Sequence, residues 1–277
     1  KNQADMTEFT IQYNKAFKGG HSLNALAGYS WNKNNNQEAF MDNYNFPTDD
    51  YSYNNMAAGT ALKDGKATEK TYQEEYKLVG YFGRINYNYQ GKYYLSASIR
   101  HEGSSKFGAD HKWGTFPAVS IGWNLKEESF LKNVNFLSFL KLRAGYGITG
   151  TIPGNPYLSL NTLDLGGYGY YGGQWTTLLR ASSNPNPDLR WEKKKETNIG
   201  LDFAFFNDRI SGSIDWYNRD TDDLIWDYTV SVPPYVKNTI TANAGSIRNR
   251  GLEVSLNSRK NEIFHLGYGN QLLYKHQ

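Results

Sequence analysis

The chain has 277 residues, a nearly balanced charge of +3, no cysteine, and an aromatic share of 16% supplied by 22 Tyr, 14 Phe and 7 Trp. The balanced charge lacks the concentrated basic surface of a nucleic-acid-binding protein, and the absence of cysteine excludes disulfides and thiolate metal sites. No run of 18 apolar residues exists, which excludes a membrane-spanning helix. A mean hydropathy of −0.70 is still compatible with a membrane β-barrel, because only alternate strand residues face lipid there.

Apolar and polar residues alternate with a period of two over much of the chain, which predicts β-strands. In one stretch Tyr81, Ile85 and Tyr87 fall on one face, while Arg84 and Asn86 fall on the other. We expect about ten strands of roughly ten residues each, the length of a tilted strand that crosses a bilayer. The clearest are 22–31, 81–89, 93–100, 140–148, 197–205, 209–217 and 251–257.

The connections between these strands alternate between short and long. This sorting is typical of a barrel with short periplasmic turns and long extracellular loops, and a soluble sandwich has no reason to show it. A connection at 126–138 belongs with the turns by its place in the alternation, and we expect a short helical turn within 127–137. Short turns are predicted at 18–21, 90–91, 207–208 and 259–261, and long loops at 33–75, 103–115, 150–193 and 220–243.

The two ends of the chain predict a fragment. The sequence begins at Lys1 without a secretory signal and ends at Gln277 within a predicted strand. We therefore expect an internal or processed part of a longer exported protein.

Residue types that support catalysis or metal binding are present without the required spacing. The five histidines are scattered, and the acidic residues at 220–223 are not followed by the glycine and closing glutamate of a calcium loop. Ser104 and Ser105 lie near His101, but no nucleophile elbow surrounds them. We expect no metal, no other cofactor and no enzymatic activity.

An ordered set of motifs between residues 79 and 257 resembles the SusC/RagA-like TonB-dependent receptors of Bacteroidetes-type bacteria. Examples are LSASIRHEGSSKFG at 95–108, LKLRAGYGITG at 140–150 and NPDLRWE at 186–192. The resemblance is specific because the motifs occur in order, and it is weak before residue 76. The other motifs lie at 83–94, 113–123, 127–131, 197–202, 209–215 and 244–256.

The resemblance implies an all-β fold, an antiparallel transmembrane β-barrel of the plugged type with about 22 strands, of which about half are present here. Residues 1–277 would all belong to the barrel domain, and the plug domain, the TonB box and the last strands are expected to be absent from them. The resemblance also implies a place in the bacterial outer membrane, in contact with its lipid and lipopolysaccharide.

The same resemblance implies a function and partners. The family imports glycans or peptides, with energy that arrives through TonB at the N-terminal region of the receptor. A SusD-like lipoprotein covers the extracellular face as a lid, and two importer–lipoprotein pairs are expected to associate as a dimer.

A glycine-rich run at 166–173 in an outer loop carries candidate residues for contact with substrate. Tyr168, Tyr170 and Tyr171, with Trp175 just beyond the run, are placed to stack on sugar rings or to pack on the lipoprotein.

A second candidate group lies on the polar face of the predicted strands. Arg84, Arg100, Lys141 and Arg143 are expected to face the lumen, where they contact the plug or line the path of the substrate.

Two alternatives remain open from the sequence. One is a soluble or surface-anchored β-rich module that binds glycans or acts as an adhesin. The other stays within the barrel class and is a siderophore or cobalamin receptor, against which the motif set argues.

Overall fold

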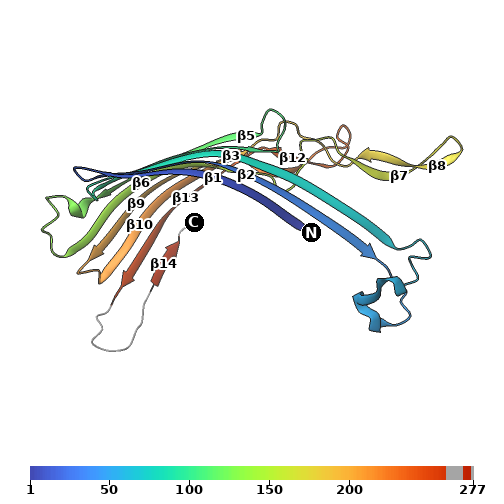
Figure 1. Ribbon diagram of the computed structural model, residues 1–277, viewed down its shortest axis with the longest axis horizontal. Coiled ribbons are helices and arrows are strands. Elements are labelled where there is room, and N and C mark those ends of the chain that lie inside the picture. The colour runs from blue at the N-terminus through green and yellow to red at the C-terminus, as the bar shows by residue number, and fades with distance from the viewer. Residues whose placement is uncertain (260–270, 276–277) are drawn as a thin grey trace.

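The chain forms one large antiparallel sheet that bends into an arch (Figure 1). The computed structural model describes residues 1–259 and 271–275. Neighbours in the sheet follow the order of the chain, apart from two inserted hairpins. The ten strands are β1 (Asn2–Phe17), β2 (His21–Asp42), β3 (Thr68–Tyr89), β4 (Tyr93–Ser104), β5 (Trp113–Asn124), β6 (Leu137–Thr151), β9 (Glu192–Phe205), β10 (Ile210–Asp222), β13 (Ser246–Ser258) and β14 (Gln271–Lys275).

Two small sheets and two short helices lie outside the large sheet. Among the residues that the structure describes, no helix is long and apolar enough to cross a membrane. One small sheet pairs β7 (Leu163–Tyr171) with β8 (Gln174–Ala181), and the other pairs β11 (Ile225–Thr229) with β12 (Thr239–Asn243). The 3-10 helices are η1 (Asp49–Ala58) and η2 (Leu125–Glu127).

All seven strands predicted from the alternation are present, and the large sheet has the expected ten strands. The predicted loop at 33–75 is wrong at both ends, because β2 and β3 each extend to 22 residues and leave a connection of only 43–67. The two strands stay paired beyond their apolar part through polar neighbours such as Lys33 and Glu75, whose charged groups lie 2.9 Å apart. A polar ladder has little hydrophobic contrast, so its periodicity is hard to see in the sequence.

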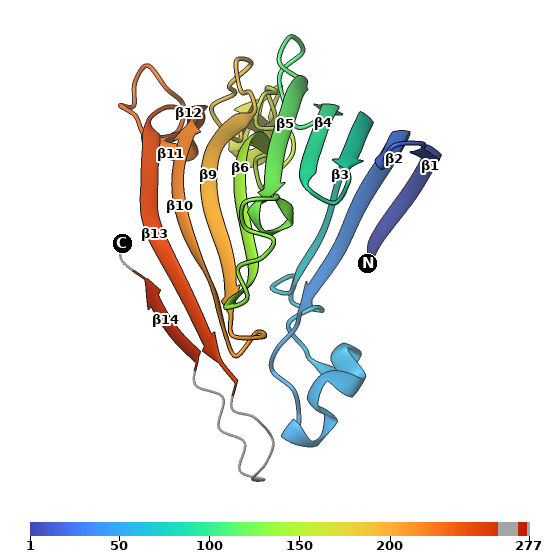
Figure 2. The same cartoon turned by 90° about the vertical axis from the view of Figure 1, so that its left-hand side faces the viewer.

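The connections alternate between the two ends of the sheet as predicted in the described part of the chain, but their lengths do not sort fully. β1–β2, β3–β4, β5–β6 and β9–β10 connect at one end, here called the turn end, and the other connections lie at the opposite loop end (Figure 1); Figure 2 views the sheet from the turn end. The predicted long loop at 103–115 is wrong in length, because β4 and β5 extend into it and leave only 105–112, which is shorter than the β5–β6 connection at 125–136. The turns before β2 and β4 place Gly19, Gly20, Gln90 and Gly91 at positive φ, the backbone that matches the twist of a tight hairpin. The predicted turn at 259–261 lies mostly outside the described residues.

Two predicted loops contain hairpins. The connection expected at 150–193 includes β7 and β8, and the one expected at 220–243 includes β11 and β12. The glycine-rich run is therefore a strand and a two-residue turn, with Gly172 and Gly173 at φ +59° and +81°. Two successive positive φ angles produce the tight hairpin reversal that glycine pairs favour.

The connection between β5 and β6 also differs from its prediction. The expected helical turn at 127–137 is wrong in position, because η2 occupies 125–127 and non-helical turns follow. The Lys126 ammonium closes these turns, since it donates to the carbonyl oxygens of Leu131, Lys132 and Val134 at 3.2, 3.2 and 2.8 Å.

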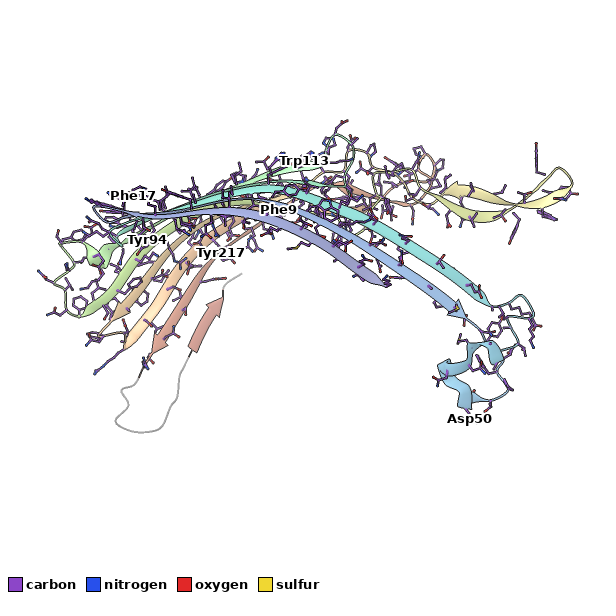
Figure 3. The ribbon with its side chains drawn as sticks, in the orientation of Figure 1. Phe9, Phe17, Asp50, Tyr94, Trp113 and Tyr217 are labelled. Atoms are coloured by element: carbon purple, nitrogen blue, oxygen red, sulfur yellow. The ribbon has the colours of Figure 1, made fainter. Side chains whose placement is uncertain are left out.

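Strand register divides the side chains of the large sheet between two faces. Figure 3 shows Trp113 on the convex side of the arch, and Tyr94 and Tyr217 on the concave side. The convex face carries the apolar set in strand after strand, for example Ile85 opposite Ala97. The concave face carries the polar set.

Two rows of aromatic rings border the apolar band of the convex face. Toward the turn end His21 stacks on Tyr89 at 4.5 Å between ring centroids, and Tyr93 and Trp123 continue the row in steps of 6.2 Å. Such rows are found where membrane barrels meet the lipid headgroups.

The second row runs toward the loop end. Tyr29, Tyr81 and Trp113 follow one another at 5.3 and 6.3 Å, and His101 stacks on Trp113 at 4.8 Å. Trp113 and Trp123 lie ten residues apart on β5, roughly 33 Å along the strand. A strand tilt of about 40° reduces this to about 25 Å, the usual height of the apolar band of a membrane barrel.

The apolar band has no protein layer over it. Between the two rows, Ile121 is 58% exposed, and its convex-face neighbours Leu95, Val119 and Ile99 are also exposed. A sandwich requires a second large sheet about 10 Å away, and in the described part of the chain the only other sheets have two strands each. The sandwich expected for a soluble glycan-binding module is therefore not the fold of these residues.

Candidate functional site

The loop end of the sheet is closed by a small buried core. Phe107, Phe116, Leu189 and Trp191 are buried together, with the Trp191 ring 5.0 Å from that of Phe107 and 5.1 Å from that of Phe116. These residues come from the β4–β5 connection, from β5 and from the segment before β9. The core therefore joins loops that are far apart in the sequence.

The motif at 184–192 holds this end together with side-chain amides. Asn184 is buried, donates to the carbonyl oxygens of Lys237 and Thr239 at 2.7 and 2.8 Å, and accepts from the amides of Val236 and Lys237 at 3.0 and 3.2 Å. Asn186 donates to the carbonyl oxygen of Thr241 at 2.9 Å. A single motif thus fixes the β11–β12 hairpin.

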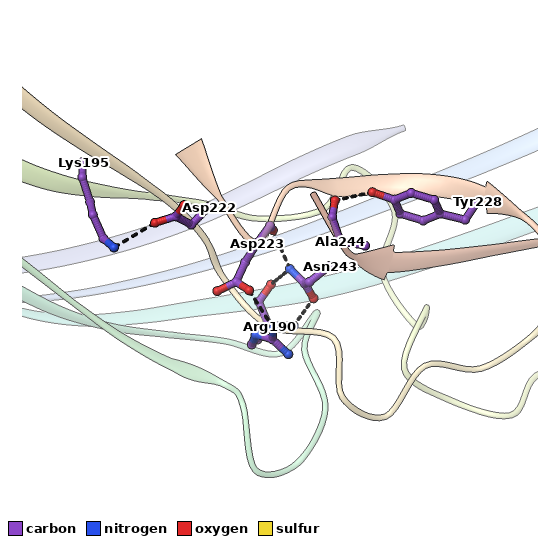
Figure 4. Close-up of polar contacts among 7 residues, drawn as sticks. All are labelled: Arg190, Lys195, Asp222, Asp223, Tyr228, Asn243 and Ala244. Carbon is purple, nitrogen blue, oxygen red and sulfur yellow. Dashed lines mark hydrogen bonds and ion pairs between the residues drawn. The ribbon is translucent and has the colours of Figure 1, made fainter. Parts of the chain in front are cut away.

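A charged pair completes this arrangement (Figure 4). The Arg190 guanidinium lies 2.6 Å from the Asp223 carboxylate. The Asn243 side chain accepts from the Arg190 amide at 2.8 Å and donates to the carbonyl oxygens of Arg190 and Asp223 at 2.7 and 2.9 Å. We call Asn184, Asn186, Arg190, Asp223 and Asn243 the loop hub.

Hydrogen bonding to Arg190 lowers the pKa of Asp223, and the same bond raises the pKa of Arg190. Both groups therefore stay ionised at neutral pH, and the pair is stable there.

The backbone of the β4–β5 loop lies so close to the motif at 184–192 that residue 108 must be glycine. A Cβ atom on Gly108 would lie 1.7 Å from the carbonyl oxygen of Pro187, and the Gly108 amide donates to the carbonyl oxygen of Leu189 at 3.4 Å. Only glycine allows the β4–β5 loop to approach the motif this closely.

The four cationic residues predicted for the lumen all lie on the concave face, but the structure does not gather them into one site. Arg143 bridges two carboxylates, at 2.9 Å from Asp202 and 2.8 Å from Asp215. Gly200 leaves the space for this bridge, since a Cβ atom there would lie 2.5 Å from the Asp215 carboxylate.

The other three members of the group have different surroundings. Arg100 binds Glu102 at 2.7 Å, and the Lys141 ammonium lies 4.5 Å from the centre of the Tyr94 ring. In the described part of the chain, Arg84 forms no ion pair. Arg100 and Arg143 are thus neutralised by carboxylates that the sequence analysis did not single out.

A hollow of about 440 Å³ lies on this concave face. An amide ladder crosses its floor: Asn86 donates to Asn24 at 3.2 Å and accepts from Ser96 at 2.7 Å. Lys141 and Arg143 line its side toward β6. The hollow presents amides, hydroxyls and cations, which suits a polar chain or hydrated contents.

The predicted aromatic residues of the glycine-rich run lie on the β7–β8 hairpin, which projects from the loop end (Figure 1). Tyr168 and Tyr170 pair with Thr177 and Trp175, so these residues share one face. Tyr171, 85% exposed, lies on the opposite face. The structure therefore brings three of the four predicted residues together.

The same face of the hairpin also carries leucines that were not predicted. Leu163, Leu165 and Leu179 follow Tyr168 and Trp175 along it, and all are exposed. This apolar hairpin face mixes aliphatic and aromatic side chains, which is typical of a protein contact and less suited to stacking on sugar rings alone.

The acidic group at 220–223 is used for ion pairs. Asp220 binds Arg248, Asp222 lies 2.8 Å from Lys195, and Asp223 belongs to the loop hub. Among the described residues no cluster of three His, Asp or Glu side chains is arranged to hold a metal ion. His265 and His276 lie outside the described residues.

Comparison with known proteins agrees with the barrel-like geometry of the sheet. The family profile described as "TonB dependent receptor-like, beta-barrel" matches residues 2–275. "TonB-dependent receptor SusC" of Bacteroides thetaiotaomicron is 43% identical over 203 residues, 71% of this chain and 20% of its own length. "TonB-dependent receptor P3" of Formosa agariphila is 36% identical over 254 residues, 92% of this chain and 25% of its own length. The chain thus spans a fifth to a quarter of these relatives.

Solved structures show the same fold. The RagAB peptide transporter superposes with a TM-score of 0.84 over 99% of this chain and 30% of its own, at 24% identity. The ferric enterobactin receptor PfeA of Pseudomonas aeruginosa superposes less well, with a TM-score of 0.60 at 14% identity over 100% of this chain and 36% of its own. The fold is therefore a part of a TonB-dependent barrel, and the resemblance to the SusC/RagA-like group is confirmed.

Proposed function

Because the chain belongs to the TonB dependent receptor-like β-barrel family, we propose that it forms part of the wall of an outer-membrane nutrient importer. In this arrangement the convex face contacts lipid, the turn end is periplasmic and the loop end is extracellular. The supporting observation is the exposed apolar band between two aromatic rows, on a sheet whose concave face carries paired charges.

The proposed activity is TonB-dependent uptake of oligosaccharides or peptides together with a SusD-like surface lipoprotein. Residues 1–277 supply barrel strands, while a plug domain, the contact with TonB and the last strands belong to other parts of the protein. Two importer–lipoprotein pairs form a dimer. The substrate crosses without the making or breaking of a covalent bond, so the protein acts as a transporter and not as an enzyme.

The concave cations have two roles in this proposal. Arg100 and Arg143 are held by carboxylates, so they support the plug and the hydrated lumen. Arg84 and Lys141 form no ion pair with a described residue, which leaves their charges available to a passing substrate.

The apolar hairpin face is proposed to pack on the lipoprotein. A two-stranded hairpin alone is marginally stable in water, so an exposed apolar face on one calls for a partner. Trp175, 71% exposed, and the neighbouring Tyr170 form a T-shaped pair with ring centroids 5.5 Å apart, which makes a rigid anchor.

Uptake by whole cells tests the proposal. Cells that express the full-length protein with its lipoprotein are supplied with a fluorescent maltoheptaose or a fluorescent mixed peptide digest, with and without TonB. We expect the cells to accumulate one of these two fluorescent substrates, and to do so only when TonB is present. Accumulation of neither, or recovery of the protein in the soluble fraction without detergent, contradicts the proposal and favours a binding module.

A further inference from the structure

The loop-end part of β3 is paired on one side only. β2 pairs with all of Thr68–Tyr89, whereas β4 pairs only with Leu78–Tyr89. From Thr68 to Lys77 the edge that faces β4 therefore has no strand partner in the described part of the chain. A strand edge presents a row of main-chain hydrogen-bonding groups.

Two residues of this edge are already capped. The Lys77 amide donates to the Ser105 hydroxyl at 2.9 Å, and the Lys77 carbonyl accepts from the Ser105 amide at 3.0 Å. The Glu75 amide donates to the Tyr157 hydroxyl at 2.8 Å. Strand residues alternate in the direction of these groups, so the amides and carbonyls of Glu69, Thr71 and Gln73 point the same way.

No hydrogen bond from another described residue reaches the main chain of these three residues on that edge. The row therefore offers three donors and three acceptors at the spacing of a β-ladder.

The usual protections of a free edge are only partly present here. Natural edges are blocked by proline, by bulges or by charged residues. Residues 68–77 contain no proline, and the β2–β3 register runs without a bulge. Charged residues flank the free row at Glu69, Lys70, Glu74, Glu75 and Lys77, but the central residues 71–73 carry no charge.

A tyrosine borders the free edge on the concave side. Tyr72 is 52% exposed and donates to Glu74 at 2.7 Å, and Phe40, 56% exposed, is its diagonal neighbour on β2, on the far side of β3 from the free edge. Tyr157 lies at the end of the free row and limits its length. A strand placed beside β3 would lay one of its concave-face side chains against Tyr72.

We propose that the edge Glu69–Gln73 binds an extended peptide, which adds to β3 as a further strand and ends at Tyr157. The inference rests on the proposed function for its extracellular position, and it names peptides as the substrate class. Main-chain hydrogen bonds supply the affinity, so the site accepts many sequences, and Tyr72 contacts one side chain of the peptide on the concave face.

Peptide binding to the full-length importer with its lipoprotein, in detergent, tests this site. The probe is a fluorescein-labelled heptapeptide of alternating threonine and lysine, and its affinity is measured by anisotropy. Gln73→Pro removes one of the three free N–H donors, the one nearest Tyr157, and proline is tolerated there because that N–H does not face β2. Gln73→Ala keeps the N–H and is the matched control. We expect about tenfold weaker binding for Gln73→Pro and less than a twofold change for Gln73→Ala.

A second arm does not depend on the folding of a variant. The same heptapeptide methylated on alternate backbone nitrogens is tested on the unaltered protein, and we expect about tenfold weaker binding. Three outcomes would each overturn the inference. They are equal affinity of the two peptides, equal effects of Gln73→Pro and Gln73→Ala on peptide binding, and a loss of lipoprotein binding while peptide binding is unchanged.

The outcomes separate this site from the proposed function. Peptide binding with the expected pattern but without TonB-dependent uptake supports the site and contradicts the transport proposal. TonB-dependent uptake with peptide binding unaffected by Gln73→Pro and by methylation contradicts the site alone.

Discussion

At the loop end, single asparagine side chains link segments that strands do not connect. Asn184 forms four hydrogen bonds to the main chain about fifty residues further along the sequence. Pro185, directly after Asn184, has no main-chain N–H to donate to a regular ladder, and the Asn184 side chain forms the hydrogen bonds instead.

Replacement of Asn184 by alanine should loosen the β11–β12 hairpin locally. The substitution removes four hydrogen bonds to the main chain of this segment, including those from the amides of Val236 and Lys237, which together costs about 3 kcal/mol. We expect hydrogen exchange at these amides to become roughly a hundredfold faster. Asn238→Ala in the same segment is the control, and equal exchange rates in the two variants would show that Asn184 does not hold the hairpin.

Acid should open the loop hub through Asp223. The hydrogen bond to Arg190 lowers the pKa of Asp223 in the folded protein. The pair therefore stabilises the folded hub fully at any pH above the ordinary aspartate pKa of about 4. This stabilisation is lost as the pH falls through the lowered pKa of Asp223. Limited proteolysis at 223–245 should therefore increase below about pH 4. Asp223→Asn should be cleaved more readily at neutral pH and lose this acid step, and an unchanged acid step in the variant would assign it to another group.

Among the elements, the β7–β8 hairpin has two faces of different character. One face carries Tyr170, Trp175 and the exposed leucines, and the other carries Tyr171 and Gln174. Two adjacent tyrosines, both exposed, thus point in opposite directions, which provides a matched pair for a binding test.

Under the proposed function, Tyr170→Ser should weaken the association of the importer with the proposed lipoprotein, and Tyr171→Ser should not. Loss of a buried aromatic anchor typically costs about 2 kcal/mol, which corresponds to roughly thirtyfold in affinity. Co-purification of the lipoprotein from detergent extracts measures the difference. Equal recovery with both variants would remove the hairpin face from the interface, and weaker binding of a labelled oligosaccharide by Tyr170→Ser alone would favour sugar stacking.

The sequence predicted the strands of the membrane band because their signal is local. Alternation of Tyr81, Ile85 and Tyr87 against Arg84 and Asn86 requires only the chain itself. The polar extensions of β2 and β3 lack this contrast, and the glycine-rich run predicts a loop because glycine disfavours strands. The sequence shows part of the loop hub only as the motif at 186–192 and does not predict its contacts, since the partners of Asn184 and Asn243 are main-chain groups that no residue type identifies.

For the whole molecule, the two faces of the sheet should respond differently to the same charge. Ile121 lies on the convex face and Ser120, its neighbour on β5, on the concave face. Arginine on the lipid side of a membrane barrel costs about 2–4 kcal/mol near the midplane, whereas a polar lumen tolerates it.

Ile121→Arg should therefore reduce the folded fraction in the outer membrane, and Ser120→Arg should leave it nearly unchanged. The heat-modifiable mobility of the full-length protein on a semi-native gel measures this fraction. If Ser120→Arg were the more harmful substitution, the assignment of the two faces would be reversed.

The order of strands in the large sheet has a consequence for how such proteins diversify. Each strand pairs only with its neighbours along the chain, and the segments 152–191 and 223–245 leave and re-enter the sheet at the same end. Recombination between related genes can therefore exchange either segment without a change of register in the wall. The replacement must keep the asparagines of the hub, and a replacement of 152–191 must also keep Leu189 and Trp191, because these side chains contact parts of the loop end that are not exchanged. New outer surfaces can then be acquired in single genetic steps while the wall stays the same.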